Sequence, residues 1–223
     1  MRAASHEHAA RSRYNGGVSV TGIVRVACPA CSRERDCKLV QSINTTTDRE
    51  AVQRLLAGDI NVLACDCGAR TQLAARLVFR DPERDYTCQV VPDGKMAESA
   101  ALFDAAGLTG TRRLVPSQNA LVEKVRMLDA GLADWALEMT KVLLLASVGG
   151  TALEDVLLFE GADGGVIHWL RFAAHAKPSR TASALGAYEK LATRDASRPR
   201  RDELRIDRAW AIAAVEAMIT SGN

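Results

Sequence analysis

Four cysteines in two close pairs are the residues of this chain whose types and spacing could do chemistry. Cys28-Pro29-Ala30-Cys31 forms the first pair, and Cys65-Asp66-Cys67-Gly68 forms the second. A structural zinc site needs two tight turns that each present two thiolates to one Zn²⁺ at about 2.3 Å. Pro29 pre-sets the first turn, and Gly68 stands where such turns often need a positive φ. The pattern predicts a zinc ribbon ligated by Cys28, Cys31, Cys65 and Cys67.

The second pair is irregular, because one residue separates Cys65 from Cys67 where the usual turn has two. Three alternatives follow from the six cysteines of the chain. All four paired cysteines bind zinc, or Cys37 or Cys88 replaces one of them, or the pairs bind no metal and are reduced or redox-active. Cys37 and Cys88 fall on predicted strands, where a buried inert cysteine is the commoner case.

The predicted metal is structural. Four thiolates leave no open position for water, and catalysis at zinc normally requires one. Such a site carries a net charge of about −2, and Arg33, Arg35 and Arg70 are close enough in sequence to offset it. Because metal binding contributes directly to folding, the β-rich half of the chain should depend on the metal.

Composition excludes some classes of protein. The 223 residues suffice for one large domain or two small ones, and only 4% are aromatic, so aliphatic side chains must form the core. The net charge of +2 argues against a dedicated electrostatic nucleic-acid binder. The chain has no apolar run long enough to span a bilayer, and its first residues lack the apolar region of a secretory signal. We therefore expect a cytoplasmic protein, without membrane association, whose cysteines are reduced.

The first half of the chain reads as a β-rich domain. Residues 1–17 are polar and are expected to form a disordered arm, and the β domain covers residues 18–93. Period-two alternation predicts strands at 18–26, 60–64, 73–79 and 86–91, and an apolar-polar return strand after Cys31 that includes Leu39, Val40 and Ile43. A capping box of Thr47 and Glu50 is expected to begin a helix that ends at Gly58.

The second half, residues 95–223, reads as an α-rich domain with one β-hairpin. Apolar residues from Leu121 to Val142 recur at helical spacing, with a break at residues 129–131, and indicate either core packing or a partner-helix interface. A short helix is expected at 97–106 and the hairpin at 156–172. Closing helices are expected at 181–193 and 207–219, the last with Asp207 as its N-cap. The predicted fold class is α+β.

Around these residues the chain resembles the CpXC family of bacterial proteins, named for paired Cys-Pro-x-Cys motifs. The likeness extends from about Val18 to the C-terminus and departs from the family at the second pair, where members usually show Cys-x-x-Cys-Gly. It implies a zinc-ribbon-like β domain with an α-rich extension, and it supplies a fold without an established activity. Besides the cysteines, the residues that carry it are Ser42–Thr45, Leu55–Asn61, Val78–Asp81, Asn119–Val125 and Gly131–Asp134.

A search for catalytic residues finds no convincing set. His168 falls on the predicted hairpin and is expected to make an ordinary hydrogen bond, and the chain lacks a nucleophile motif such as Gly-x-Ser-x-Gly. The glycine-rich stretch 161–165 lacks the Lys and Ser/Thr of a phosphate loop and is expected to be a turn. Glu123 and Lys124 are adjacent on a predicted helix and are expected on a solvated face.

These observations favour a non-enzymatic zinc-binding adaptor or scaffold that binds a protein partner or a second copy of the chain. The first alternative is a nucleic-acid-binding or transcription-associated zinc ribbon, which would use Arg33, Arg35, Arg70 and the arginine-rich segment 194–208. The second alternative is an enzyme whose site forms between subunits from His168, Glu123 and a free cysteine.

Overall fold

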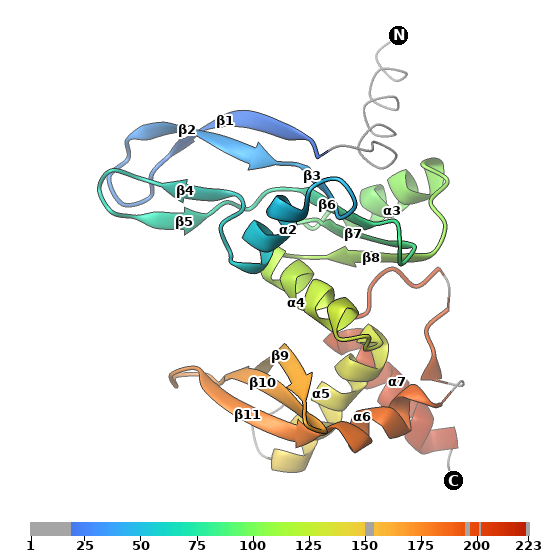
Figure 1. Ribbon diagram of the computed structural model, residues 1–223. Helices are drawn as coiled ribbons and strands as arrows, with labels where there is room; N and C mark the ends of the chain where they lie inside the picture. The colour runs from blue at the N-terminus through green and yellow to red at the C-terminus, as the bar shows by residue number, and fades with distance from the viewer. Residues whose placement is uncertain (1–18, 150–153, 195–196, 201, 222–223) are drawn as a thin grey trace. The chain divides into compact units, whose positions relative to one another are not determined.

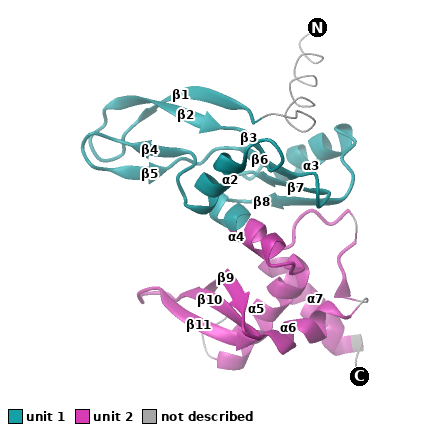
Figure 2. Ribbon diagram, viewed as in Figure 1, with its two compact units in different colours: residues 1–122 teal, residues 123–223 magenta. Residues whose placement is uncertain are grey.

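The computed structural model describes residues 19–149, 154–194, 197–200 and 202–221, and the chain divides into two compact units. Unit 1 comprises residues 1–122 and unit 2 residues 123–223 (Figure 2). The boundary falls within helix α4 (Gln118–Asp129), whereas the predicted domain boundary at residues 93–95 lies inside unit 1. The arm expected at residues 1–17 lies outside the described residues. The mixed composition of helices and strands confirms the α+β class.

The part of unit 1 that carries the two cysteine pairs consists of two antiparallel hairpins, which we call the ribbon. Strands β1 (Thr21–Ala27) and β2 (Glu34–Val40) form the first hairpin, and β4 (Val62–Ala64) and β5 (Arg70–Gln72) form the second. Their turns lie at the same end of the ribbon (Figure 1). A two-stranded hairpin is marginally stable alone, so the ribbon needs an additional stabilising element.

The rest of unit 1 is a four-stranded sheet with the order β3-β6-β7-β8. Its strands are β3 (Ser42–Asn44), β6 (Leu77–Asp81), β7 (Tyr86–Val90) and β8 (Thr111–Val115). The central β6–β7 pair is antiparallel, but β3–β6 and β7–β8 are parallel. Parallel neighbours require long connections, which helices α2 (Arg49–Leu56) and α3 (Met96–Ala105) help to supply. The buried side chains include Ile43, Leu55, Phe79 and Phe103.

Three sequence-based expectations for unit 1 need correction. Of the strand predicted at 73–79 only the end is a strand, because residues 73–76 form the connection between β5, which ends at Gln72 in the ribbon, and β6, which begins at Leu77 in the larger sheet. Strand β8 was not predicted. Helix α2 begins one residue later than expected, since the Asp48 carboxylate, in place of the Thr47 hydroxyl, accepts a hydrogen bond from the Ala51 N–H at 2.9 Å.

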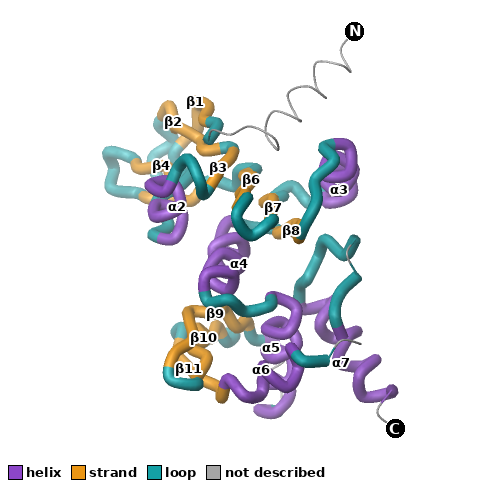
Figure 3. The backbone as a smooth tube through the Cα atoms, turned by 45° about the vertical axis from the view of Figure 1, so that its right-hand side comes forward, coloured by secondary structure: helices purple, strands orange, loops and turns teal. Residues whose placement is uncertain are grey.

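Unit 2 packs helices α5 (Asp134–Val148), α6 (Leu185–Ala192) and α7 (Arg208–Ser221) with a three-stranded antiparallel sheet of order β11-β10-β9 (Figure 3). The strands are β9 (Val156–Asp163), β10 (Val166–Phe172) and β11 (Ser179–Ala184). Phe159 and Trp169 meet edge to face in the core, with ring centroids 6.0 Å apart. None of the helices in the described ranges combines the length and apolar character that a membrane crossing requires.

The sequence pattern of unit 2 is largely confirmed. The apolar stripe breaks between α4 and α5 at Gly131, whose φ is +68°, and the stripe residues Val125, Trp135 and Met139 are buried. Asp207 caps α7, because its Oδ1 accepts a hydrogen bond from the Trp210 N–H at 3.1 Å. The helix predicted from Thr181 begins only at Leu185, because residues 179–184 pair with β10 as strand β11.

Candidate metal centre

The four paired cysteines meet where the turns of the two hairpins face each other. Their sulfur atoms all lie within 4.8 Å of one another. The Sγ atoms of Cys28 and Cys67 are 3.7 Å apart, and those of Cys31 and Cys65 are 3.6 Å apart. Four sulfurs at about 2.3 Å from a central zinc-sized ion stand about 3.8 Å from each other. Sulfur spacing and chemistry therefore fit a tetrahedral ion, and the cluster could hold a metal.

The two turns share one backbone design despite their different cysteine spacing. In the first turn the Cys28 N–H donates to the Arg33 carbonyl and the Ser32 N–H donates to the Cys28 carbonyl, at 2.9 and 2.8 Å. In the second turn the Cys65 N–H donates to the Ala69 carbonyl and the Gly68 N–H to the Cys65 carbonyl, both at 2.9 Å. Each of the two hydrogen bonds of the second turn joins residues that are one position closer in sequence than in the corresponding bond of the first turn.

A residue with positive φ directly follows the second cysteine of each turn. Ser32 has a φ of +58° and Gly68 a φ of +87°. This conformation reverses the chain so that the second sulfur faces the cluster. The missing spacer between Cys65 and Cys67 thus shortens the second turn without removing either sulfur from the cluster.

The four sulfurs differ in their exposure to solvent. Cys28 and Cys65 are buried among apolar neighbours that include Leu63, Val24 and Val26. Cys31 is half-buried, whereas Cys67 is exposed. The cluster therefore has a dry inner side and one sulfur at the surface.

Hydrogen bonds and one arginine shape the electrostatics of the cluster. The pKa of Cys65 is lowered to about 6, mainly because the Cys67 backbone N–H bonds to its sulfur, with help from the Cys67 and Cys31 thiols and the Arg35 guanidinium. The Ala69 backbone N–H lowers the pKa of Cys67. The Cys65, Cys31 and Cys28 thiols and partial loss of hydration have the opposite and larger effect, so that the pKa of Cys67 is raised to about 11.

Of the arginines expected to offset thiolate charge, Arg35 is in place. It forms an ion pair with Asp66, between the second pair of cysteines, and the hydrogen bond to Cys65 raises the pKa of its guanidinium. Arg70 is engaged elsewhere, 2.9 Å from Asp59.

The two remaining cysteines lie outside the cluster. Cys37 is buried on β2, and Cys88 is fully buried on β7 in the larger sheet. Neither supplies one of the grouped sulfur atoms. Both occupy strands, as the sequence predicted.

Asn61 connects the two hairpins of the ribbon. Its side-chain Oδ1 accepts from the Val40 N–H at 2.7 Å, and its Nδ2 donates to the Val40 carbonyl at 3.1 Å. The side chain is buried, and the backbone adopts a φ of +55°. Asn61 therefore serves Val40 as a neighbouring strand would, and it fixes β2 beside the second hairpin. Sequence reasoning noted Asn61 only as part of the family resemblance.

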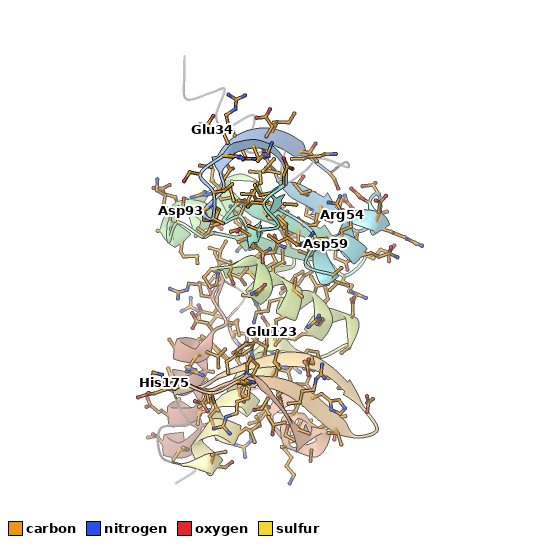
Figure 4. The ribbon with its side chains drawn as sticks, turned by 90° about the vertical axis from the view of Figure 1, so that its left-hand side faces the viewer. Glu34, Arg54, Asp59, Asp93, Glu123 and His175 are labelled. Carbon is orange, nitrogen blue, oxygen red and sulfur yellow. The ribbon has the colours of Figure 1, made fainter. Side chains whose placement is uncertain are left out.

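A buried cluster of charges in unit 2 was missed by sequence reasoning. Glu123 and Lys124 were expected on a solvated face, but they are only 7% and 4% exposed. The Glu123 side chain lies between α4 and the unit 2 sheet (Figure 4) and accepts from the Phe159 N–H at 2.6 Å. Lys124 Nζ lies 3.1 Å from the Asp134 carboxylate and donates to the Ile206 carbonyl at 3.0 Å.

Lys141 completes this cluster. Its Nζ lies 2.8 Å from Glu123 Oε1 and 2.9 Å from Glu138 Oε1, and Glu138 also lies 3.6 Å from Lys124. The signal in the sequence was helix α5 itself, which is apolar on most sides yet carries charges at positions 134, 138 and 141. Charges within such a helix have to pair internally. The geometry ties α4 and α5 to β9 and to the segment before α7.

The candidate residues for other chemistry fall in different units of the chain. His168 lies on β10 and makes the expected ordinary hydrogen bond, with its Nε2 3.2 Å from Asp163 Oδ1. His168 and Glu123 belong to unit 2, whereas all six cysteines belong to unit 1.

A family model described as CpXC protein matches residues 26–141, slightly more than half of the chain. The matched range contains the four clustered cysteines, Asn61 and all five members of the charge cluster. No curated protein and no solved structure gives a match.

Proposed function

The chain belongs to the CpXC family, and on that basis we propose that its four paired cysteines hold a structural zinc ion that makes the ribbon a rigid platform for a protein partner. The observation that carries the proposal is the four-sulfur cluster between the two hairpin turns. Four thiolates fill the tetrahedral positions of zinc and leave none for a substrate, which favours a non-enzymatic role. All six cysteines lie in the described residues and none forms a disulfide there, and we propose a reducing, cytoplasmic environment for the protein.

Metal content tests the first part of the proposal. Protein purified without chelator is examined by native mass spectrometry beside its denatured mass. We expect one zinc per chain in the wild type and in Cys88→Ala, and a large loss of zinc in Cys28→Ser. A wild-type protein that carries no metal and whose thiols titrate freely would contradict the proposal.

The outer face of β1 is where we place the partner. Ile23 is 78% exposed at the middle of this strand, opposite Lys38 of β2. Arg25 lies beside it and pairs with Asp36 at 3.2 Å and with Glu34 at 3.8 Å. An exposed apolar residue with a charged rim has the composition of a small interaction site.

The edge of β1 suggests the form of the partner. Within the described residues β1 pairs with β2 alone, and its sequence Thr-Gly-Ile-Val-Arg-Val-Ala carries a single charge. Long edge strands with so little protection are suited to accept another strand. The proposed partner is therefore a protein that supplies an extended segment with an apolar side chain for Ile23.

Site-specific crosslinking in cells tests this second part. A photoreactive residue at position 23 should crosslink one discrete protein, and the same residue at the exposed position Glu50 should not. Ile23→Asp combined with a photoreactive residue at Thr21 should abolish the product. Crosslinks to the chain itself would identify a homo-oligomer, and equal products from positions 23 and 50 would refute the platform.

The nucleic-acid alternative has weaker support. Four of its arginines pair with carboxylates, Arg35 with Asp66, Arg70 with Asp59, Arg200 with Asp202 and Arg205 with Asp207. Binding through phosphates would produce a gel shift that weakens steeply with salt. The proposal expects no shift at low salt.

A further inference from the structure

We infer that the metal centre is also a peroxide-sensitive switch, in which oxidation joins the two hairpin turns by Cys28–Cys67 and Cys31–Cys65 disulfides and releases the ion. This inference rests on the proposed zinc site and adds its regulation. The reacting groups are the four clustered sulfurs, and the oxidant is a hydroperoxide.

The two pairs are defined by geometry. Cys28 and Cys67 sulfurs stand 3.7 Å apart and those of Cys31 and Cys65 stand 3.6 Å apart, and both contacts cross from one turn to the other. A disulfide needs about 2.05 Å between sulfurs. Each pair must close by about 1.6 Å, a distance that side-chain rotation can cover.

Exposure to solvent determines which sulfur of the Cys28–Cys67 pair reacts with peroxide and which one then closes the disulfide. Cys67 is the exposed sulfur of the cluster, and Cys28, directly behind it, is 1% exposed. Peroxide therefore reaches Cys67 first, while the sulfur that resolves the product is shielded from solvent. In the proposed zinc-bound state all four sulfurs are thiolates, so the exposed Cys67 beside the shielded Cys28 has the arrangement of a redox sensor and its resolving cysteine.

The chemistry balances with two equivalents of peroxide. The Cys67 thiolate attacks one peroxide oxygen, the O–O bond breaks, and a sulfenic acid forms as hydroxide leaves. The Cys28 sulfur then attacks the sulfenic sulfur and displaces a second hydroxide, which gives the disulfide, and two protons convert the hydroxides to water. The same sequence on Cys31 and Cys65 consumes the second equivalent. Each disulfide removes two electrons and two ligands from the cluster.

Loss of ligands has a structural consequence. After the first disulfide only Cys31 and Cys65 remain as thiolates, and two ligands do not hold a structural zinc. Release of the ion removes its contribution to the folding of the ribbon. The platform around Ile23 is then weakened although the two turns are covalently joined.

The experiment uses the full zinc-loaded chain, whose metal content is first measured by native mass spectrometry. Hydrogen peroxide is added in steps while a chromogenic chelator reports released zinc. We expect one zinc per chain after the first equivalent and complete reversal by a dithiol with added zinc. Cys88→Ala should behave as the wild type, and Cys67→Ser, where it retains zinc, should release it at least tenfold more slowly.

Peptide mapping identifies the bonds. Proteolysis before Asp66 separates Cys65 from Cys67, and backbone fragmentation between Cys28 and Cys31 assigns their partners. The expected first bond is Cys28–Cys67. Bonds within the turns, or sulfinic acids without a disulfide, in a protein that did bind zinc would overturn the inference and leave the proposed zinc site intact. Protein that binds no zinc before oxidation would instead overturn the proposed function.

Discussion

Asn61 shows how one side chain can replace a strand. Its amide satisfies both backbone groups of Val40 in a position where only 3% of the asparagine is exposed. Its positive φ of +55° also suits asparagine better than most residues. The alignment of the two hairpins, and so of the two cysteine pairs, depends on this residue.

Asn61→Ala should therefore loosen the ribbon. It leaves the buried N–H and C=O of Val40 unpaired, which we expect to lower the free energy of unfolding of unit 1 by about 3 kcal/mol. Asn61→Gly loses the same hydrogen bonds but tolerates the positive φ, so it should be about 1 kcal/mol less destabilised. Hydrogen exchange of the β1 and β2 amides, followed at increasing urea concentrations, measures the loss of unfolding free energy in both variants. Asn119→Ala, at an exposed position, is the control, and equal midpoints for Asn61→Ala and Asn119→Ala would disprove this role.

Lys141 holds the buried charges of unit 2 together. Without it Glu123 would lose its cation and Glu138 would keep only Lys124, 3.6 Å away, and loss of one partner from a buried ion pair destabilises by about 3–5 kcal/mol. We expect this loss in Lys141→Met and little change in Lys190→Met, whose lysine is exposed. Urea unfolding followed by tryptophan fluorescence is suitable, because Trp135, Trp169 and Trp210 all lie in unit 2.

The same lysine gives unit 2 an alkaline limit. Burial lowers the pKa of Lys141, but the charges and hydrogen bonds of Glu138 and Glu123 raise it further, so the folded pKa exceeds the unfolded one. A raised pKa contributes stability that is complete below the unfolded value of about 10.4 and is lost as pH rises through the folded value. The urea concentration at the midpoint of unfolding, followed by tryptophan fluorescence, should therefore decrease as the pH rises above about 10.4. This decrease should be smaller in Lys141→Met. An identical pH profile for the two proteins would exclude this coupling.

At the scale of the element, the two cysteine turns need a reversed backbone more than a fixed cysteine spacing. A Cβ at Gly68 would have no atom within 4 Å, so Gly68→Ala is strained by its φ of +87° alone. The cost is about 1 kcal/mol, or about fivefold in metal affinity. Ser32→Gly, at a φ of +58°, should strengthen binding by a similar factor. Competition with a zinc chelator measures both, and a Gly68→Ala protein that binds as tightly as the wild type would show that the turn conformation does not limit ligation.

Elements with local signals could be predicted from the sequence, and elements that depend on distant partners could not. The alternation in β1, the turn at Gly164 and Gly165 and the break at Gly131 lie in short stretches of chain. Strand β8 contains two arginines and forms because Tyr86 to Val90 pair with it, and β11 forms because β10 does. The alternation at 73–79 begins in the connection after β5 and continues into β6, and periodicity alone does not show where the strand starts.

The site shows the same division. Cysteine spacing predicted the four sulfurs that the structure brings together. The roles of Asn61 and Lys124 depend on Val40 and on Ile206, which are 21 and 82 residues away in sequence. Side-chain type and spacing carry no information about such partners.

At the scale of the molecule, the metal should matter to one part of the chain and not to another. The core of unit 2 is a single cluster of buried residues from Met127 to Val215, with no member from the ribbon. The larger sheet of unit 1 has its own buried side chains, among them Phe79 and Phe103. The ribbon instead packs its few apolar residues around the cysteines themselves.

Removal of the proposed zinc should therefore unfold the chain in part. With a strong chelator we expect hydrogen-exchange protection to be lost in β1, β2, β4 and β5, because metal binding energy is folding energy for such a module. Protection in β6 and β7 should persist, and the tryptophan-detected midpoint of unit 2 should not move. Cys28→Ser without chelator should reproduce the pattern, and Cys88→Ala should not. Protection that survives in β1 and β2 after the metal is gone would mean that Asn61 and the apolar contacts suffice to hold the ribbon, and the zinc would then have to serve a role other than folding.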